Sequence, residues 1–177
     1  MLGHLRRTAF GISLLQAASA IAAKTLLGKI TAQVVNFETG SVATGTTVIP
    51  LDDTIPQNTE GDQYMSLAIT PTNAASTLII EAVLHLASNS TSALIAALFQ
   101  DATASALASA IVFQDAASNV VEVVIRHKMV AGTTSATTFK VRAGNVGANT
   151  TTFNGQTAAR LFGGSLASSI TITEVLP

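Results

Sequence analysis

The 177-residue chain contains no cysteine and no tryptophan, and it has a single tyrosine. The absence of cysteine excludes disulfide bonds, thiolate nucleophiles and cysteine-ligated metals, so packing alone must hold the fold. Charge is scarce as well, because Asp, Glu, Lys and Arg make up 11% of the residues, against about 25% in soluble domains. Serine and threonine outnumber these charged residues. We therefore expect a neutral, hydroxyl-rich surface, suited to a close-packed oligomer or particle.

The few charges nearly cancel, giving a formal net charge of −1. Binding to nucleic acid is driven largely by Lys and Arg side chains that neutralise phosphates, so we expect no nucleic-acid partner. The glycine-containing segments Gly144–Gly147 and Phe162–Gly164 lack the GxxxxGK[ST] spacing of a phosphate-binding loop. We therefore expect no cofactor.

Residues 1–29 are the one stretch with a helical pattern, because they are rich in alanine and leucine and contain no proline. Leu14, Ala18 and Ile21 recur at spacings of four and three residues, which places them on one stripe of a helix. Three such helices could pack together through this stripe, or the helix could dock onto another protein. The segment is therefore predicted to be an arm for association or anchoring.

Two other interpretations of this segment stay open. Arg6 and Arg7 precede an uncharged run, and Ala18–Ala20 has the small residues of a cleavage site. Residues 1–23 thus also have the outline of a secretory signal peptide. Alternatively, the helix packs back onto its own sheet. A transmembrane helix is a weaker alternative, because the uncharged run is shorter than the roughly 20 residues that cross a bilayer.

From residue 30 onward the pattern has period two, which indicates β-strands. It is clearest in residues 77–86, where alternate side chains from Leu78 to Leu86 are apolar and predict a core face. Residues 120–129 alternate in the same way, as does the later segment in which Phe139 and Val141 point inward. A glycine-containing connection predicts that these last two segments are antiparallel neighbours.

About eight or nine short strands separated by turns are expected in all, the pattern of an antiparallel β-sandwich or jelly roll. The predicted fold class is therefore all-β. Residues 30–177 are expected to form this sandwich head, and residues 1–29 to form an N-terminal α-helical arm.

The segment Ser92–Phe99 is apolar on both faces. In a two-sheet sandwich only one face of a strand reaches the core, so the second face is expected to need a partner. This expectation and the low charge predict a homotrimer whose interface includes one face of this strand or of Ala106–Phe113. The residues assigned to that interface on the strand are Ala93, Ile95, Ala97 and Phe99.

A corner of the chain, with a backbone restricted by proline and glycine, is expected between Ser41 and Tyr64. Thr46–Ile49 is predicted to be a short strand, after which Pro50 and Pro56 exclude helix and interior strand because proline lacks an amide proton. Gly61 is expected to take a positive φ just before the next strand.

This corner also holds the one concentration of carboxylates, at Asp52, Asp53, Glu60 and Asp62. Asp side chains next to proline-linked turns bond nearby backbone amides, and we expect that role here. Calcium binding through the same oxygens is the weaker alternative, because the spacing fits no EF-hand loop. No metal site is predicted.

Four cations are candidates for a basic ladder on one sheet face, an arrangement more typical of a solvated surface than of an anion or glycan site. They are Arg126, Lys128, Lys140 and Arg142. Tyr64 and Phe153 are weak candidates for sugar-stacking aromatics on loops. His85 and His127 are too far apart in sequence for a metal motif, and no nucleophile elbow accompanies them. No enzymatic activity is expected.

Several blocks, in this order, carry a resemblance to known proteins: GTTVIPLDDTIPQNTEGDQYM, SLAITPTNAASTLIIEAVLHLAS, SALIAALFQD, MVAGTTSATTFKVRAG, TTFNGQTAARLFGG and SSITITE. Together they span roughly residues 31–177. In these blocks the chain resembles a domain family common in phage tail-fibre and other virion proteins, and in phage-derived genes of bacteria.

The resemblance implies a bacteriophage structural protein on the particle surface, either a short fibre or spike or a capsid decoration protein. Other virion proteins of the capsid or tail are then the expected partners, with a host surface glycan or receptor as a further candidate. The alternative is a secreted or cell-surface bacterial adhesin of similar fold, exported by residues 1–23.

Overall fold

The computed structural model describes residues 30–177. The expected helical arm, with Leu14, Ala18 and Ile21, lies outside the described residues. Within them the chain is all-β apart from the short 3-10 turn η1 (Phe162–Gly164), and every strand pairing is antiparallel. The all-β, antiparallel expectation is confirmed.

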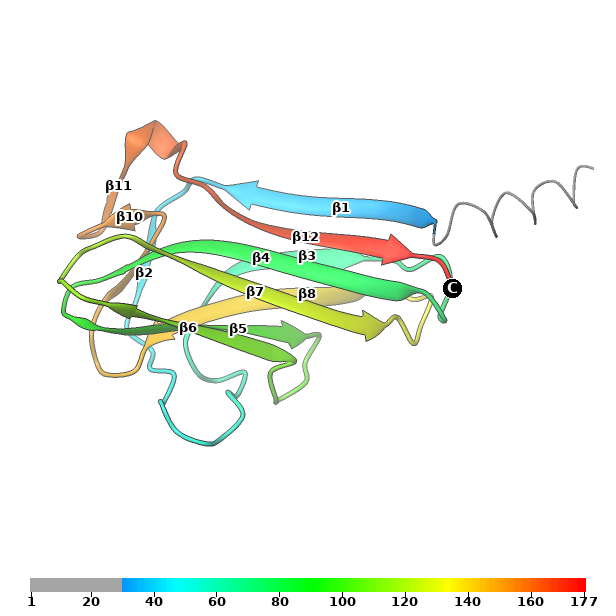
Figure 1. The fold of residues 1–177 in the computed structure, drawn as a ribbon, viewed down its shortest axis with the longest axis horizontal. Coiled ribbons are helices and arrows are strands. Elements are labelled where there is room, and N and C mark those ends of the chain that lie inside the picture. The colour runs from blue at the N-terminus through cyan, green and yellow to red at the C-terminus, as the bar shows by residue number, and fades with distance from the viewer. Residues whose placement is uncertain (1–29) are drawn as a thin grey trace, which may run out of the picture.

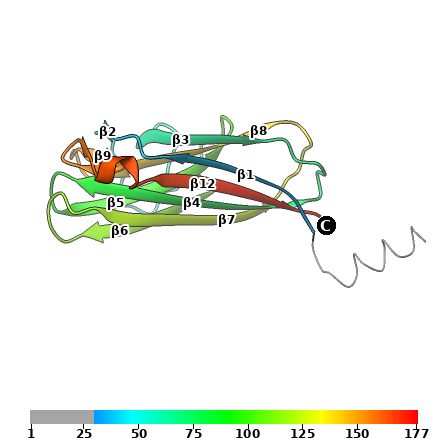
Figure 2. The ribbon, with the colours of Figure 1, turned by 90° about the horizontal axis from the view of Figure 1, so that it is seen from above.

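Two sheets lie in layers over a shared core (Figures 1 and 2). The six-stranded sheet has the order β1-β12-β4-β9-β2, and β7 also pairs with β4. Its strands are β1 (Thr31–Thr39), β2 (Ala43–Gly45), β4 (Thr77–Ser88), β7 (Val121–Val130), β9 (Thr151–Phe153) and β12 (Ser168–Val175). The four-stranded sheet, in the order β3-β8-β5-β6, contains β3 (Asp62–Ile69), β5 (Ser92–Gln100), β6 (Ala108–Gln114) and β8 (Thr137–Asn145). A small ribbon joins β10 (Gly155–Gln156) to β11 (Ala159–Arg160).

The predicted core face of β4 is confirmed. Leu78, Leu84 and the other apolar side chains at alternate positions of this strand are almost completely buried. They meet Leu94 and Leu98 of β5 and Phe139 of β8 in one hydrophobic cluster. The strand alternation read from the sequence therefore identifies the inner face of both sheets.

The predicted pairing of residues 120–129 with the strand of Phe139 is wrong. β7 pairs with β4, whereas β8 pairs with β3 and β5. The connection after β7 crosses from one sheet to the other, and the amide groups of Ala131 and Gly132 donate to the carbonyls of Ser76 and Ala74. A positive φ of 70° at Gly132 accompanies this crossing.

The corner between β2 and β3 is an irregular segment. The expected strand Thr46–Ile49 is not formed, since β2 ends at Gly45. Ile49 is instead buried, and its amide donates to the carbonyl of Asn145 over 3.0 Å. Gly61 has the expected positive φ of 62°. A Cβ atom there would lie 2.8 Å from Ile49 Cδ1 and 2.9 Å from the carbonyl oxygen of Ala143, so no larger residue fits.

Both ends of the described chain lie at the same end of the sandwich. The amide of Leu176 donates to the carbonyl of Ile30 over 2.8 Å, and β10 and β11 lie at the opposite end (Figure 1). No helix within residues 30–177 is long and apolar enough to cross a membrane.

Candidate interaction surfaces

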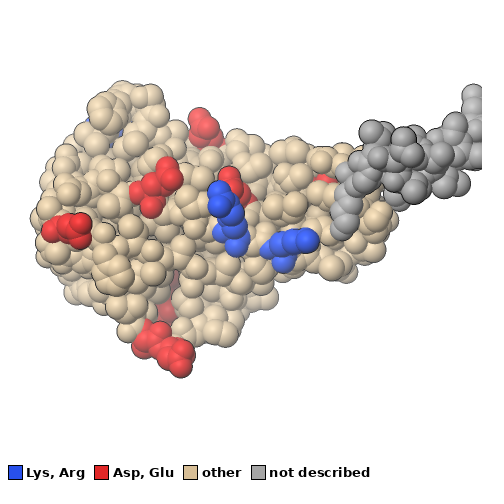
Figure 3. All heavy atoms as spheres, in the orientation of Figure 1, with Lys and Arg blue, Asp and Glu red and all other residues tan. Residues whose placement is uncertain are grey.

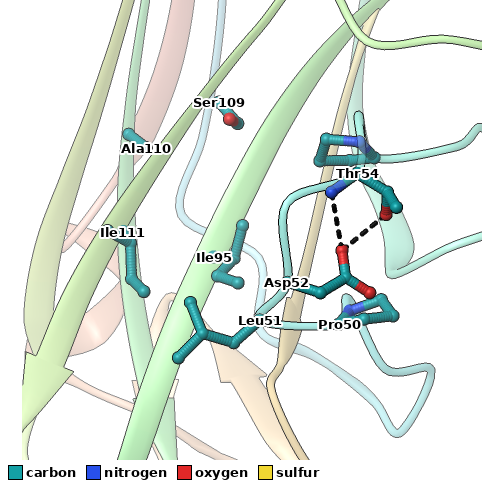
Figure 4. A pocket seen from close by; sticks show the side chains of 9 residues that line it. Pro50, Leu51, Asp52, Thr54, Ile95, Ser109, Ala110 and Ile111 are labelled. Atoms are coloured by element: carbon teal, nitrogen blue, oxygen red, sulfur yellow. Dashed lines mark hydrogen bonds between the residues drawn. The ribbon is translucent and has the colours of Figure 1, made fainter.

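A groove separates residues 50–56 from β6, one of the two edge strands of the four-stranded sheet. It consists of two neighbouring hollows of about 160 and 360 Å³. Ile95 of β5, Leu51 of the loop and Ile111 of β6 all line the smaller of the two hollows (Figure 4). The walls of this groove mix apolar side chains with the polar groups of Asp52, Thr54 and Ser109.

The rim of the groove and the adjacent surface of β6 expose large apolar side chains. These residues, which we call the β6 patch, are Leu51, Ile55, Ile111 and Phe113, with exposed fractions of 59%, 58%, 43% and 65%. Because β6 pairs only with β5, its other edge carries no strand in this sheet. An exposed apolar patch beside an open strand edge is typical of a protein contact.

The four strand residues assigned from sequence to a subunit interface are covered by their own chain. Ala93, Ile95, Ala97 and Phe99 are all buried in the single protomer, with Ile95 6% exposed. The amide groups of Asn58 and Ala106 bond the carbonyls of Ala104 and Pro56, which ties the corner segment to the β5–β6 connection. This face therefore needs no second subunit to cover it.

The carboxylates of the corner make separate local hydrogen bonds. Asp52 accepts from the hydroxyl and the amide of Thr54, and these two bonds lower the pKa of Asp52. Glu60 accepts from the amide of Gln57, and Asp62 accepts from the amide and hydroxyl of Thr47.

Asp53 is exposed. Across residues 30–177, no three acidic or histidine side chains gather closely enough to hold a metal ion. The expected turn role is confirmed for Asp52, whose bond to the Thr54 amide is an Asx turn.

The expected basic ladder is wrong, because its members belong to different sheets. Arg126 and Lys128 lie on β7 of the six-stranded sheet, and Arg126 pairs with Glu81 over 2.7 Å. Lys140 and Arg142 lie on β8 of the other sheet. Strand alternation correctly puts each pair on one face, but sheet membership separates the pairs.

Lys140 and Arg142 line a third hollow, of about 260 Å³, on the outer side of the four-stranded sheet. The other lining residues are Asn58, Gln63, Phe99, Asp101 and Ala102. We call it the cationic hollow. Arg142 donates from Nε and Nη2 to the carbonyls of Glu60 and Gly61 over 2.8 and 2.6 Å, and Lys140 Nζ donates to the carbonyl of Asp101 over 2.7 Å.

The aromatic and histidine residues singled out from the sequence do not form a ligand-binding site in the described part of the chain. Phe153 is buried and stacks on Tyr64, with ring centroids 4.8 Å apart. These two weak candidates for sugar stacking lie on strands β9 and β3 rather than on loops. Burial, helped by Asp62, raises the pKa of Tyr64. His127 shares its register with core-facing Ile80, whereas His85 lies on the opposite face of the sheet.

A scan of protein-family models finds no match to this chain, and neither does a search of curated proteins. Solved structures with a similar fold include the C-terminal domain of EclA, a sugar-binding protein, at 15% identity over 63% of this chain and 73% of that one, with a TM-score of 0.36. A second is the TNF Eiger from S. frugiperda, at 6% identity over 81% and 93%, with a TM-score of 0.46. A third is the VP2 subviral particle of infectious bursal disease virus, at 9% identity over 82% and 40%, with a TM-score of 0.36. Likenesses this distant carry no argument about function.

Proposed function

We propose that the protein is a structural component of a bacteriophage particle, displayed on its surface as a jelly-roll head. The observation that carries the proposal is the strand order. Four long strands in the order β1-β12-β4-β7 face four in the order β3-β8-β5-β6, which is the interleaved order of a jelly roll. Jelly rolls recur in viral capsid and lectin domains. Because a fold alone does not specify a function, the resemblance of the sequence blocks to phage virion proteins is the second support.

The surface of the head supports a role among protein neighbours. Charged side chains are few and separated by wide uncharged areas on the face formed by the six-stranded sheet (Figure 3). The hydrophobic cluster unites both sheets within residues 30–177. We infer that this part of the chain folds without residues 1–29. We assign to them the attachment to a capsid or tail protein.

The test of attachment is a truncated protein that begins at Ile30. It should be soluble and folded, with a melting temperature close to that of the full chain, but it should be missing from particles viewed by electron microscopy. The full-length protein, added to the same particles, is the control. Normal decoration by the truncated protein would overturn the anchoring role, and failure of that protein to fold would place the first 29 residues in the core.

The mass of native protein separates this proposal from a secreted adhesin. A virion protein retains its N-terminal segment, whereas export by a signal peptide removes roughly residues 1–23. Intact-mass measurement on natively expressed material therefore distinguishes the two, and a processed N-terminus would favour the adhesin.

We further propose that the head is a homotrimer whose subunits meet through the β6 patch. A second copy of this chain is the expected occupant, because the small net charge causes little repulsion between copies and the open edge of β6 adjoins the exposed apolar side chains. Burial of such side chains is the main source of association energy.

Phe113→Asp tests this interface, with Phe162→Asp as the matched control. The two phenylalanines are 65% and 76% exposed, so neither change should greatly destabilise the protomer. Phe162 lies on η1, which follows β11 and contributes no residue to the β6 patch. Light scattering should find trimers for the wild type and for Phe162→Asp, but monomers for Phe113→Asp. A wild-type protein that stays monomeric at micromolar concentration would refute the trimer.

A further inference from the structure

The cationic hollow plays no part in the proposed subunit contact, yet it combines a defined cavity with two cations that form no ion pair among the described residues. Within residues 30–177 the one ion pair joins Arg126 to Glu81, on the other sheet. Residues 1–29 contain no Asp or Glu, so no acidic side chain there can neutralise Lys140 or Arg142. Both cations are held by backbone carbonyls, which orient a side chain without cancelling its charge.

The hydrogen bonds leave donors available for a ligand. A guanidinium carries five N–H groups, and Arg142 uses only Nε and Nη2 in its bonds to Glu60 and Gly61. Because these bonds already fix the side chain, little further conformational entropy is lost on binding. A planar guanidinium also matches the two oxygens of a carboxylate.

The carboxylate of Asp101 restricts the charge and the hydrogen-bonding groups of a ligand that the cationic hollow can bind. Its carboxylate accepts from the amide of Thr138 and from the hydroxyl of Thr137, each over 2.8 Å, and each oxygen retains further acceptor capacity. Two cations and one carboxylate give the hollow a net charge of +1 (2 − 1), which favours a monoanion over a phosphate dianion. The remaining acceptor sites favour a ligand that also carries hydroxyl donors.

The size of the cavity and its other lining residues also fit a small monoanion that carries hydroxyl groups. The volume of about 260 Å³ lies below the range of about 300–1,000 Å³ for pockets that hold drug-sized ligands, so the hollow suits only a small ligand. Asn58 donates from Nδ2 to the carbonyl of Thr103 over 3.0 Å, which leaves its side-chain oxygen as an acceptor. Phe99 supplies an apolar wall.

We propose that the cationic hollow, formed by Lys140, Arg142, Asp101 and Asn58, binds a sugar residue that carries a carboxylate, such as a uronic acid. Arg142 and Lys140 bind the carboxylate, and Asp101 and Asn58 accept hydrogen bonds from ring hydroxyls. This ligand class deepens the host contact expected of a particle-surface protein and rests on that proposed function for its biological role, but the chemistry of binding does not depend on assembly.

The experiment titrates the full-length protein with methyl glucuronide, neutral methyl glucoside and inorganic phosphate, followed by calorimetry or ligand-observed NMR. Methyl glucuronide should bind in the millimolar range and about tenfold more tightly than either other probe, as expected for a charge-assisted hydrogen bond. Equal binding of methyl glucoside, tighter binding of phosphate, or no binding of any probe would overturn the proposal.

Lys140→Gln should weaken methyl glucuronide binding about tenfold. The matched control is Lys128→Gln, which removes the same charge from an exposed position on the other sheet and should leave binding unchanged. Arg142→Lys, a second variant, keeps the charge but loses the planar fork, and it should also weaken binding. If Lys128→Gln weakens binding as much as Lys140→Gln, the attraction is unspecific and no site exists. Because binding is measured on the isolated protein, failure here leaves the particle-attachment experiment unaffected.

Discussion

The stability of the sandwich should depend on one buried carboxylate, that of Glu174 on β12. This residue is 0% exposed and has no cationic partner among the described residues. Its oxygens accept from Gln33 Nε2 over 2.7 Å, from the amide and hydroxyl of Thr72 over 2.9 and 2.8 Å, and from the amide of Asn73 over 3.2 Å. These bonds join β1, β12 and the turn between β3 and β4.

Burial by itself would raise the pKa of Glu174, but the hydrogen bonds from Gln33 and Thr72 outweigh it and lower the pKa from 4.5 to about 2. A lowered pKa in the folded state means that the charged form favours folding. The stabilisation is therefore fully present above pH 4.5 and is lost as the pH falls toward 2. A shift of this size corresponds to roughly 3 kcal/mol of unfolding free energy.

Glu174→Gln tests this reasoning, because the amide keeps the shape but cannot accept with both ends. At pH 7 the variant should lose roughly 3 kcal/mol of unfolding free energy in urea titrations. The gap from the wild type should shrink between pH 4.5 and pH 2, as the wild-type carboxyl becomes protonated. Glu122→Gln, at an exposed position on β7, is the control and should change little. Equal stability at pH 7, or a gap that does not change with pH, would refute the argument.

Asn154→Ala should lower the unfolding free energy by about 2 kcal/mol or more, since it leaves buried groups unpaired. The Nδ2 of Asn154 donates to the carbonyl of Thr39 over 2.6 Å, and its Oδ1 accepts from Ser168 over 2.6 Å; a urea titration that finds no loss would show that other groups replace these bonds. Asp52→Ala should lower the melting temperature slightly, and added calcium should change neither protein; calcium-dependent melting would indicate a metal site. Ile95→Asp should unfold the protomer rather than release soluble monomers, because it places a charge at a buried position; a folded monomer by circular dichroism and light scattering would contradict this.

Local features of the fold could be predicted from the sequence. Alternation along residues 77–86 identified the core face of β4 because successive side chains of a strand point to opposite sides. The Asx turn at Asp52 and the positive φ at Gly61 followed from the chemistry of single residues. Each of these inferences depends on neighbours within a few positions, so no knowledge of the tertiary structure was needed.

The candidate surfaces depend on contacts between distant parts of the chain, and the sequence could not identify them. Ile95 was correctly recognised as apolar on a two-faced strand, but its cover comes from residues 50–56 rather than from a second subunit. The cationic hollow joins Lys140 and Arg142 to Asn58, more than 80 positions earlier in the chain than Arg142. The only indication in the sequence was that Lys140 and Arg142 lie on the same face of one strand.

The sequence by itself determined the core face of β4, the turn features at Asp52 and Gly61 and that the chain forms strands, since periodicity and turn chemistry are local properties. Only the tertiary structure decided that β7 pairs with β4 rather than with β8, and that the four expected members of the basic ladder separate onto two sheets. The physical reason is that backbone hydrogen bonds join strands without regard to side-chain identity. The choice of partner therefore depends on how the connections cross between layers and on how the whole core packs.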